Sequence, residues 1–229
     1  MSKLTRVQEN TFLASPRNMS KLEILRDRAS MLAKARRFFL DRNITEVDCP
    51  IIGVSGCIDA HIDLFPVSIG KEIRYLHTSP EYWMKRLIIE GMGDIYQLSH
   101  VFRLGEQGAR HNPEFTMAEW YLVGATFEMM IEQTVDFVRL FIGNLPYEVI
   151  TYRQAFQCYA NIDYFTSTVN DLLKYIERRG IPTYQGIEKE GKNALLNLIL
   201  GTVIEPHFGQ NNIITVLAYY PATQAALAK

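Results

Sequence analysis

The most informative part of this chain is residues 101–121, which read VFRLGEQGARHNPEFTMAEWY. This pattern predicts two apolar strands joined by a loop that carries two arginines, a histidine, an asparagine and a proline, a polar density that packing alone does not explain. Such a unit can hold a nucleotide, because the planar fork of Arg103 matches a phosphate and the ring of Phe115 offers a face to a base. The alternative is an exposed hairpin with a charged tip.

The same residues resemble motif 2 of the class II aminoacyl-tRNA synthetases, in the lysine-type form that runs from Phe-Arg to His-Asn-Pro-Glu-Phe-Thr-Met (102–117). The resemblance implies an α/β fold of the α+β type, with an antiparallel sheet flanked by helices and incomplete at the C-terminus. The Arg103 strand and the Glu114–Tyr121 strand are expected side by side in the middle of this sheet. We expect one catalytic domain over residues 1–229, with motif 2 at about 101–121.

An upstream segment, residues 21–50, supports this interpretation. Ser20 and Glu23 form a predicted capping box for a helix over 21–42, which carries an apolar stripe. An alternating strand over 44–49 and a terminal proline follow. The unit resembles motif 1 of the same class, which in that family forms much of the dimer interface, so we predict a homodimer.

Bulk properties limit the class of protein. Hydrophobic residues make up 48% and charged residues 21% of the 229 residues, and the formal net charge is −1. The composition is typical of a globular protein, and it lacks the basic character of a nucleic-acid-binding domain. No apolar run reaches the ~18 residues of a membrane span. Three cysteines without metal-ligand spacing predict free thiols and no metal bound by the protein, and we expect a cytoplasmic location without membrane attachment.

The resemblance implies amino-acid adenylation with ATP, and Mg²⁺ is expected to enter with the triphosphate rather than in a protein cage. Arg103 is the candidate catalytic residue at the α-phosphate, Phe115 would stack on adenine, and Asn112 would bind the nucleotide. Arg110 and His111 are expected near the outer phosphates. The full set predicted to contact the nucleotide is Arg103, Leu104, Gly105, Glu106, Arg110, His111, Asn112 and Phe115.

The motif departs from the family pattern at one position. Lysine-type motifs usually read Arg-Asn-Glu, whereas this chain reads Arg103-Leu104-Gly105 and places Glu106 one residue later. If the family's carboxylate contacts the adenine amine or the metal, Glu106 must reach from the loop or the contact is lost.

The amino acid is expected at two segments. Ser79-Pro80-Glu81 matches the family's segment that grips the substrate backbone, with Ser79 as the N-cap and Pro80 as the first residue of a helix. Glu119 and Tyr121 lie two apart on one strand and therefore on one face. By resemblance they line the pocket for a lysine side chain, with Glu119 pairing its cationic end. The alternative is that Trp120 and Tyr121 belong to the sheet core and Glu119 is an edge charge.

Two further sequence features indicate which family within the class II synthetases the chain resembles. Residues 119–121 read Glu-Trp-Tyr, and residues 220–228 read Tyr-Pro-Ala-Thr-Gln-Ala-Ala-Leu-Ala. Together with motif 1 close to the start, which leaves no room for an anticodon-binding barrel, they resemble the elongation factor P–(R)-β-lysine ligase family. The implied substrates are ATP and lysine or β-lysine, and the implied acceptor is elongation factor P, with tRNA an unlikely partner.

The chain is expected to stop before motif 3. Two alternatives to the ligase stay open. One is a lysyl-tRNA synthetase-like paralogue that acts on tRNA. The other is a truncated, catalytically inactive chain that retains dimerisation and partial ATP binding.

Overall fold

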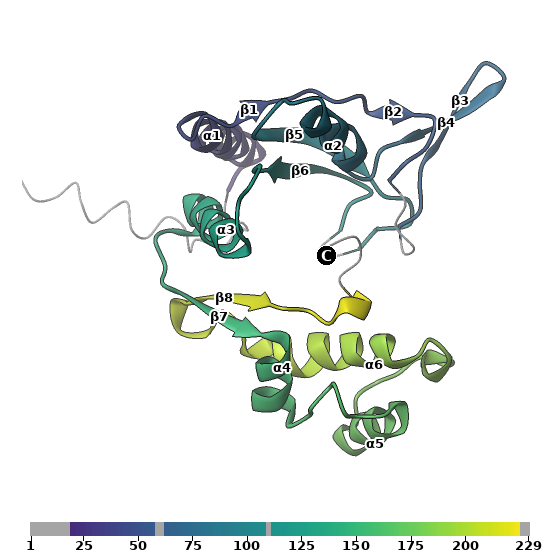
Figure 1. Ribbon diagram of the computed structural model, residues 1–229. Helices are drawn as coiled ribbons and strands as arrows, with labels where there is room; N and C mark the ends of the chain where they lie inside the picture. Colours follow the sequence, from purple (N-terminus) through teal and green to yellow (C-terminus); the bar gives the residue numbers. More distant parts are fainter. Residues whose placement is uncertain (1–18, 58–61, 109–110, 225–229) are drawn as a thin grey trace, which may run out of the picture. The chain divides into compact units, whose positions relative to one another are not determined.

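The computed structural model describes residues 19–57, 62–108 and 111–224. It contains two compact units, Met1–Phe141 and Ile142–Lys229 (Figure 1). Each unit has hydrophobic clusters of its own. The assignment of both units to one catalytic domain therefore stays a prediction. No helix within the described ranges is long and apolar enough to cross a membrane.

The first unit is built on a three-stranded sheet of order β1-β5-β6, whose strands are β1 Thr45–Glu46, β5 Ile95–Phe102 and β6 Glu114–Tyr121. Strands β5 and β6 pair antiparallel along their whole length, as the motif 2 pattern predicts. Strand β1 pairs parallel with β5. The α/β class with an antiparallel strand pair beside helices is confirmed, but only β5 is central in this sheet, since β6 lies at its edge.

Strand β1 is shorter than the predicted strand over 44–49. Its ladder with β5 ends because the N–H of Cys49 donates to the side-chain oxygen of Gln97, at 2.9 Å, instead of to a backbone carbonyl. The polar side chain of a neighbouring strand thus replaces the next ladder bond.

Helix α1, Lys21–Leu40, begins at the predicted capping box. The Glu23 N–H donates to Ser20 Oγ at 3.3 Å, and the Ser20 N–H donates to Glu23 Oε2 at 2.7 Å. Only the C-terminal half of the helix is buried, through Ala35, Phe38 and Phe39. The apolar side chains of its first turns remain exposed, including Leu22 and Leu25.

An aromatic cluster covers one face of β5 and β6. Phe39 stacks on Tyr96 with ring centroids 4.1 Å apart and lies 5.5 Å from Trp120. Phe137 closes the cluster at 5.3 Å from Phe39, and it belongs to α3, Phe127–Ile142. Because side chains alternate along a strand, Gln97, next to Tyr96, and Glu119, next to Trp120, project from the opposite face of the sheet.

A second sheet of order β2-β4-β3 and one further helix complete the first unit, with bounds β2 Ile52–Gly53, β3 Pro66–Ile69, β4 Glu72–Leu76 and α2 Glu81–Ile89. Helix α2 begins one residue later than predicted, because Pro80 is its N-cap instead of its first residue. Ser79 nevertheless caps the helix end, since its Oγ accepts from the Glu81 N–H at 3.0 Å.

The second unit packs helices around a parallel strand pair. Its strands are β7 Tyr147–Thr151 and β8 Ile214–Ala218, and its α-helices are α4 Tyr152–Ala155, α5 Val169–Arg179 and α6 Lys192–Ile199. Short π-helical segments span Phe156–Ala160 and Leu200–Ile204, and 3-10 turns span Ile187–Lys189, Glu205–His207, Gln210–Asn212 and Ala222–Gln224. Tyr152, Phe156 and Leu172 are fully buried in the core of this unit.

We expect Phe39→Ala to lower the free energy of unfolding of the first unit by ~3–5 kcal/mol, because the substitution leaves a cavity at a fully buried ring. Urea unfolding followed by tryptophan fluorescence measures this loss, since both tryptophans, Trp83 and Trp120, lie in the first unit. The control is Leu40→Ala, where 61% of the residue is already exposed and the change should stay within ~0.5 kcal/mol. Equal losses for the two variants would contradict the aromatic cluster's role.

Candidate functional site

The candidate site lies on the face of β5 and β6 opposite the aromatic cluster. The register places Gln97 of β5 directly across from Glu119 of β6. Phe115, Glu119 and Tyr121 share this face because they are separated by even numbers of residues. The strand pairing alone therefore aligns the residue predicted to stack on a base with the residues predicted to bind an amino acid.

Glu119 is held by two neutral hydroxyls. Ser79 Oγ donates to Glu119 Oε2 at 2.6 Å, and the Tyr121 hydroxyl donates to Glu119 Oε1 at 2.8 Å. Ser79 comes from the segment before α2, so this hydrogen bond joins the two segments that the sequence predicts to bind the amino acid. No salt bridge to Glu119 is found within the described part of the chain.

A second carboxylate, Glu81, opens helix α2 beside this group. Lys85 Nζ lies 2.5 Å from Glu81 Oε1, and Cys57 Sγ lies 3.6 Å from Glu81 Oε2. We call Ser79, Glu81, Glu119 and Tyr121, with Cys57 and Lys85, the acidic cluster. Pro80, the N-cap of helix α2, is buried.

Sequence reasoning missed two members of the acidic cluster. Lys85 carried a usable signal, because a lysine four residues after a glutamate on a predicted helix pairs with it. Cys57 carried none, since it lies in a loop whose path depends on contacts distant in the sequence.

The hydroxyl and thiol groups of the cluster stay neutral at neutral pH. Burial, followed by the charge of Glu119 and the hydrogen bond to it, raises the pKa of Tyr121. Burial, followed by the charge of Glu81, raises the pKa of the Cys57 thiol to about 11. Two glutamates and one lysine therefore leave the cluster with one net negative charge.

Arg103 lies at the other end of the same face. Its backbone N–H donates to the Pro113 carbonyl at 2.9 Å, and its guanidinium carbon lies 5.1 Å from the Phe115 ring centroid. Arg103 Nη1 is 3.8 Å from Glu106 Oε1. Arg103 Nε is buried and has no hydrogen-bond partner in the described structure. A partly buried guanidinium with one buried, unpaired donor fits an anionic ligand such as a phosphate.

The loop after Arg103 explains the departure from the family's Arg-Asn-Glu. Gly105 has a φ of +82°, a backbone conformation that favours glycine over other residues. A glutamate at this position would be strained, and the carboxylate instead belongs to Glu106, where it faces Arg103. The N–H of Leu104 donates to the Asp63 carbonyl at 2.9 Å, which ties the loop to the segment before β3.

The rest of the predicted nucleotide loop is more exposed. Gly108 and His111 exchange backbone hydrogen bonds of 3.0 and 3.4 Å, which closes the turn. His111 and Asn112 are exposed, and among the described residues neither side chain forms a hydrogen bond or ion pair with Arg103. Arg110 lies outside the described residues.

No group of three or more potential metal ligands occurs among the residues that the structure describes. The donors near Arg103 are a guanidinium, a single carboxylate and backbone groups. These residues suit a nucleotide that carries its own Mg²⁺ better than a metal held by side chains.

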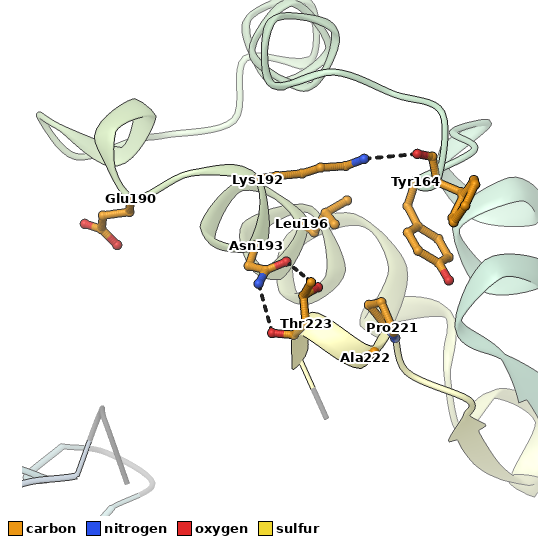
Figure 2. Close-up of a pocket in the computed structure, with 9 residues that line it drawn as sticks. Tyr164, Glu190, Lys192, Asn193, Leu196, Pro221, Ala222 and Thr223 are labelled. Carbon is orange, nitrogen blue, oxygen red and sulfur yellow. Dashed lines mark hydrogen bonds between the residues drawn. The ribbon is translucent and has the colours of Figure 1, made fainter. Parts of the chain in front are cut away.

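A cavity of about 540 Å³ lies in the second unit (Figure 2). It is lined by Tyr164, Phe165, Glu190, Lys192, Asn193, Leu196, Pro221, Ala222 and Thr223. Asn193 Nδ2 donates to the Thr223 carbonyl at 3.0 Å, and Thr223 Oγ1 donates to Asn193 Oδ1 at 3.1 Å. Lys192 Nζ donates to the Phe165 carbonyl at 3.3 Å. Asn193, Thr223 and Lys192 of the cavity lining are thus hydrogen-bonded within the protein, whereas Arg103 Nε in the first unit has no partner among the described residues.

Comparison with known proteins matches residues 3–228 to the tRNA synthetases class II (D, K and N). The chain belongs to this family. Among curated relatives, the elongation factor P–(R)-β-lysine ligases of Pasteurella multocida and Histophilus somni are each 38% identical over 216 residues, covering 92% of this chain and 66% of each relative. The ligase of Haemophilus influenzae is 35% identical over 208 residues, covering 88% of the chain and 63% of the relative.

These matches confirm the class II synthetase fold and the resemblance to the elongation factor P–(R)-β-lysine ligase family. The chain spans about two thirds of the length of the curated relatives it matches. The matched residues, 3–228, extend over both structural units.

We expect Cys57 to react with iodoacetamide at pH 8 more than ~10-fold more slowly than Cys158, an exposed cysteine of the second unit. The raised pKa of Cys57, about 11, leaves about one thiol in a thousand as the reactive thiolate at that pH. Mass spectrometry of the two tryptic peptides measures both rates in one sample. The difference should disappear in urea and shrink as the pH approaches 11, and equal rates in the folded protein would contradict the assigned environment of Cys57.

Proposed function

We propose that this chain activates lysine or (R)-β-lysine with ATP and transfers it to a lysine side chain of elongation factor P. A carboxylate oxygen of the amino acid attacks the α-phosphorus of ATP, the bond to the bridging oxygen breaks, and pyrophosphate leaves. The acceptor amine then attacks the carbonyl carbon, loses a proton, and releases AMP.

The observation that carries this proposal is the arrangement of one strand face. Phe115 and Glu119 are four residues apart on β6, which corresponds to roughly 13 Å at ~3.3 Å per residue. An adenine stacked at Phe115 and an ammonium paired at Glu119 are separated in an aminoacyl-adenylate by a ribose, a phosphate and the amino-acid chain. The strand therefore offers both anchors along one extended ligand.

At the nucleotide end, Arg103 would bind the α-phosphate, because its fork is already positioned against Phe115 and its Nε lacks a partner. The reaction concentrates negative charge at the α-phosphate, and a guanidinium cannot lose its proton to that charge. Leu104, Gly105, Arg110, His111 and Asn112 would complete the nucleotide loop. Mg²⁺, bound to the triphosphate, would neutralise the leaving pyrophosphate.

At the amino-acid end, Glu119 would pair with the side-chain ammonium of the substrate. Its two hydrogen bonds come from Ser79 and Tyr121, which orient the carboxylate without cancelling its charge. Glu81 would contact the ammonium near the substrate carboxylate. The single net negative charge of the cluster complements a diamino acid, whose net charge is +1.

Elongation factor P is favoured as the acceptor by the names of the relatives and by the charge of the chain. Affinity for tRNA depends on many contacts to phosphates, and the formal net charge here is −1. A compact protein acceptor needs fewer such contacts. The tRNA alternative draws its support from the family description, which names tRNA synthetases.

We also propose that a second copy of the chain covers the exposed start of α1. Leu22 is 64% exposed and Leu25 is 50% exposed, although both belong to an apolar stripe of a well-capped helix. The cytoplasm is the compartment we propose, because Cys49, Cys57 and Cys158 are all free.

We expect Arg103→Ala to reduce lysine-dependent ATP–pyrophosphate exchange by at least ~100-fold, by analogy with the loss of an oxyanion donor. Arg103→Lys should remain strongly impaired, because an ammonium keeps the charge but not the fork. The matched control is Arg37→Ala, which removes a guanidinium that is 70% exposed on α1. Exchange that survives in Arg103→Ala at the level of this control would remove Arg103 from the proposed site.

The acceptor is tested with labelled lysine or (R)-β-lysine, ATP and either elongation factor P or tRNA. We expect label in elongation factor P and background label in tRNA. Elongation factor P with its acceptor lysine changed to arginine, and the variant Glu119→Gln, are the negative controls. Efficient charging of tRNA with elongation factor P left unlabelled would reject the ligase in favour of the synthetase alternative.

A further inference from the structure

The two carboxylates of the acidic cluster differ in what already neutralises them. Glu81 accepts contacts on both oxygens, from the Lys85 ammonium at 2.5 Å and the Cys57 thiol at 3.6 Å. Glu119 also accepts on both oxygens, but only from the neutral hydroxyls of Ser79 and Tyr121. One carboxylate therefore has a cation of the protein, and the other keeps its full charge for a ligand.

The Lys85–Glu81 pair is weak enough to be exchanged. The Lys85 side chain is 48% exposed and that of Glu81 is 22% exposed, so water screens their attraction. A ligand ammonium that approaches Glu81 must share or displace Lys85, whereas one that approaches Glu119 meets no competing cation among the residues that the structure describes. The helix fixes this competition, because residues four apart lie on the same side of α2.

We propose that Lys85 is a specificity-determining residue of the amino-acid pocket, because its ammonium competes for Glu81 with the backbone ammonium of the substrate. Recognition then rests mainly on the side-chain ammonium at Glu119, and the ammonium near the substrate carboxylate contributes less than a free Glu81 would allow. This inference rests on the proposed function, since it assigns a role within the lysine-binding end of that site.

Three ligands separate the two ammonium positions. Lysine and β-lysine each carry a side-chain ammonium and a second ammonium near the carboxylate. 6-Aminohexanoate has the same chain, carboxylate and terminal ammonium as lysine but lacks the second ammonium. The ratio of the dissociation constants of 6-aminohexanoate and lysine therefore reports the contribution of Glu81, while effects common to both ligands cancel.

The test compares Lys85→Met with Lys85→Arg and with Lys174→Met, a matched removal of a lysine from α5 in the second unit. Methionine keeps an unbranched side chain and a good helix propensity. We expect the dissociation-constant ratio, measured by titration of the whole protein, to rise about three- to fivefold in Lys85→Met, the factor expected when a weak, half-exposed ion pair is removed. Lysine and β-lysine should both bind more tightly. The ratio should stay unchanged in Lys85→Arg and Lys174→Met.

A second readout does not depend on ligand binding. The positive charge of Lys85 lowers the pKa of the Cys57 thiol, against the larger opposing effects of burial and Glu81. Lys85→Met should therefore slow the alkylation of Cys57, whereas misfolding of the variant would accelerate it. Faster alkylation identifies an unfolded variant, and the ratio is then measured with Lys85→Gln instead.

The outcomes separate the inference from the function on which it rests. An unchanged or lower ratio in a folded variant that still binds lysine overturns the role of Lys85 and leaves the proposed function standing. Failure of the wild-type protein to bind lysine, β-lysine and 6-aminohexanoate overturns the proposed function, and the inference with it.

Discussion

The antiparallel register of β5 and β6 is the constraint on which the first unit depends. It places Tyr96 and Trp120 on the face that packs against Phe39, and Glu119 with Tyr121 on the opposite face. A slip of one residue would exchange the two faces of the slipped strand, burying a carboxylate among aromatic rings and exposing the rings. The same pairing therefore fixes both the packing of the aromatic cluster and the arrangement of the candidate site, although the cluster does not touch the site.

The half-buried carboxylate of Glu119 shows how the fold tolerates an uncompensated charge. Hydrogen bonds from hydroxyls offset part of the desolvation cost without removing the charge. A cation of the protein at the same place would stabilise the folded state more, but a ligand would then have to displace it. The hydroxyls of Ser79 and Tyr121 thus orient the Glu119 carboxylate and leave its negative charge available. Glu81, in the same cluster, is instead paired with a cation of the protein, Lys85.

The predictable parts of this structure are those that follow from local rules. The capping box at Ser20 and the strand–loop–strand around Arg103 depend on neighbours close in the sequence, and both occur as predicted. The early end of β1 depends on the side chain of Gln97, and the place of Cys57 depends on α2. Contacts between segments distant in the sequence leave no periodicity, which is why these features were missed. The resemblance suggests roles for Glu119 and Tyr121, but only the three-dimensional structure shows that Ser79 contacts Glu119.

Both ends of the candidate site contain a cation and a carboxylate that already face one another. Arg103 lies 3.8 Å from Glu106 at the nucleotide end, and Lys85 lies 2.5 Å from Glu81 at the amino-acid end. Such pairs hold long side chains in place before a ligand arrives, which reduces the conformational entropy lost on binding. The ligand then exchanges partners with a charge that is already ordered. The two ends differ in one respect, because the buried Arg103 Nε has no hydrogen-bond partner among the described residues. A phosphate would therefore gain a hydrogen bond there without displacing an existing one. In the proposed function, this asymmetry would make the nucleotide end the stronger anchor and leave discrimination among amino acids to the carboxylates.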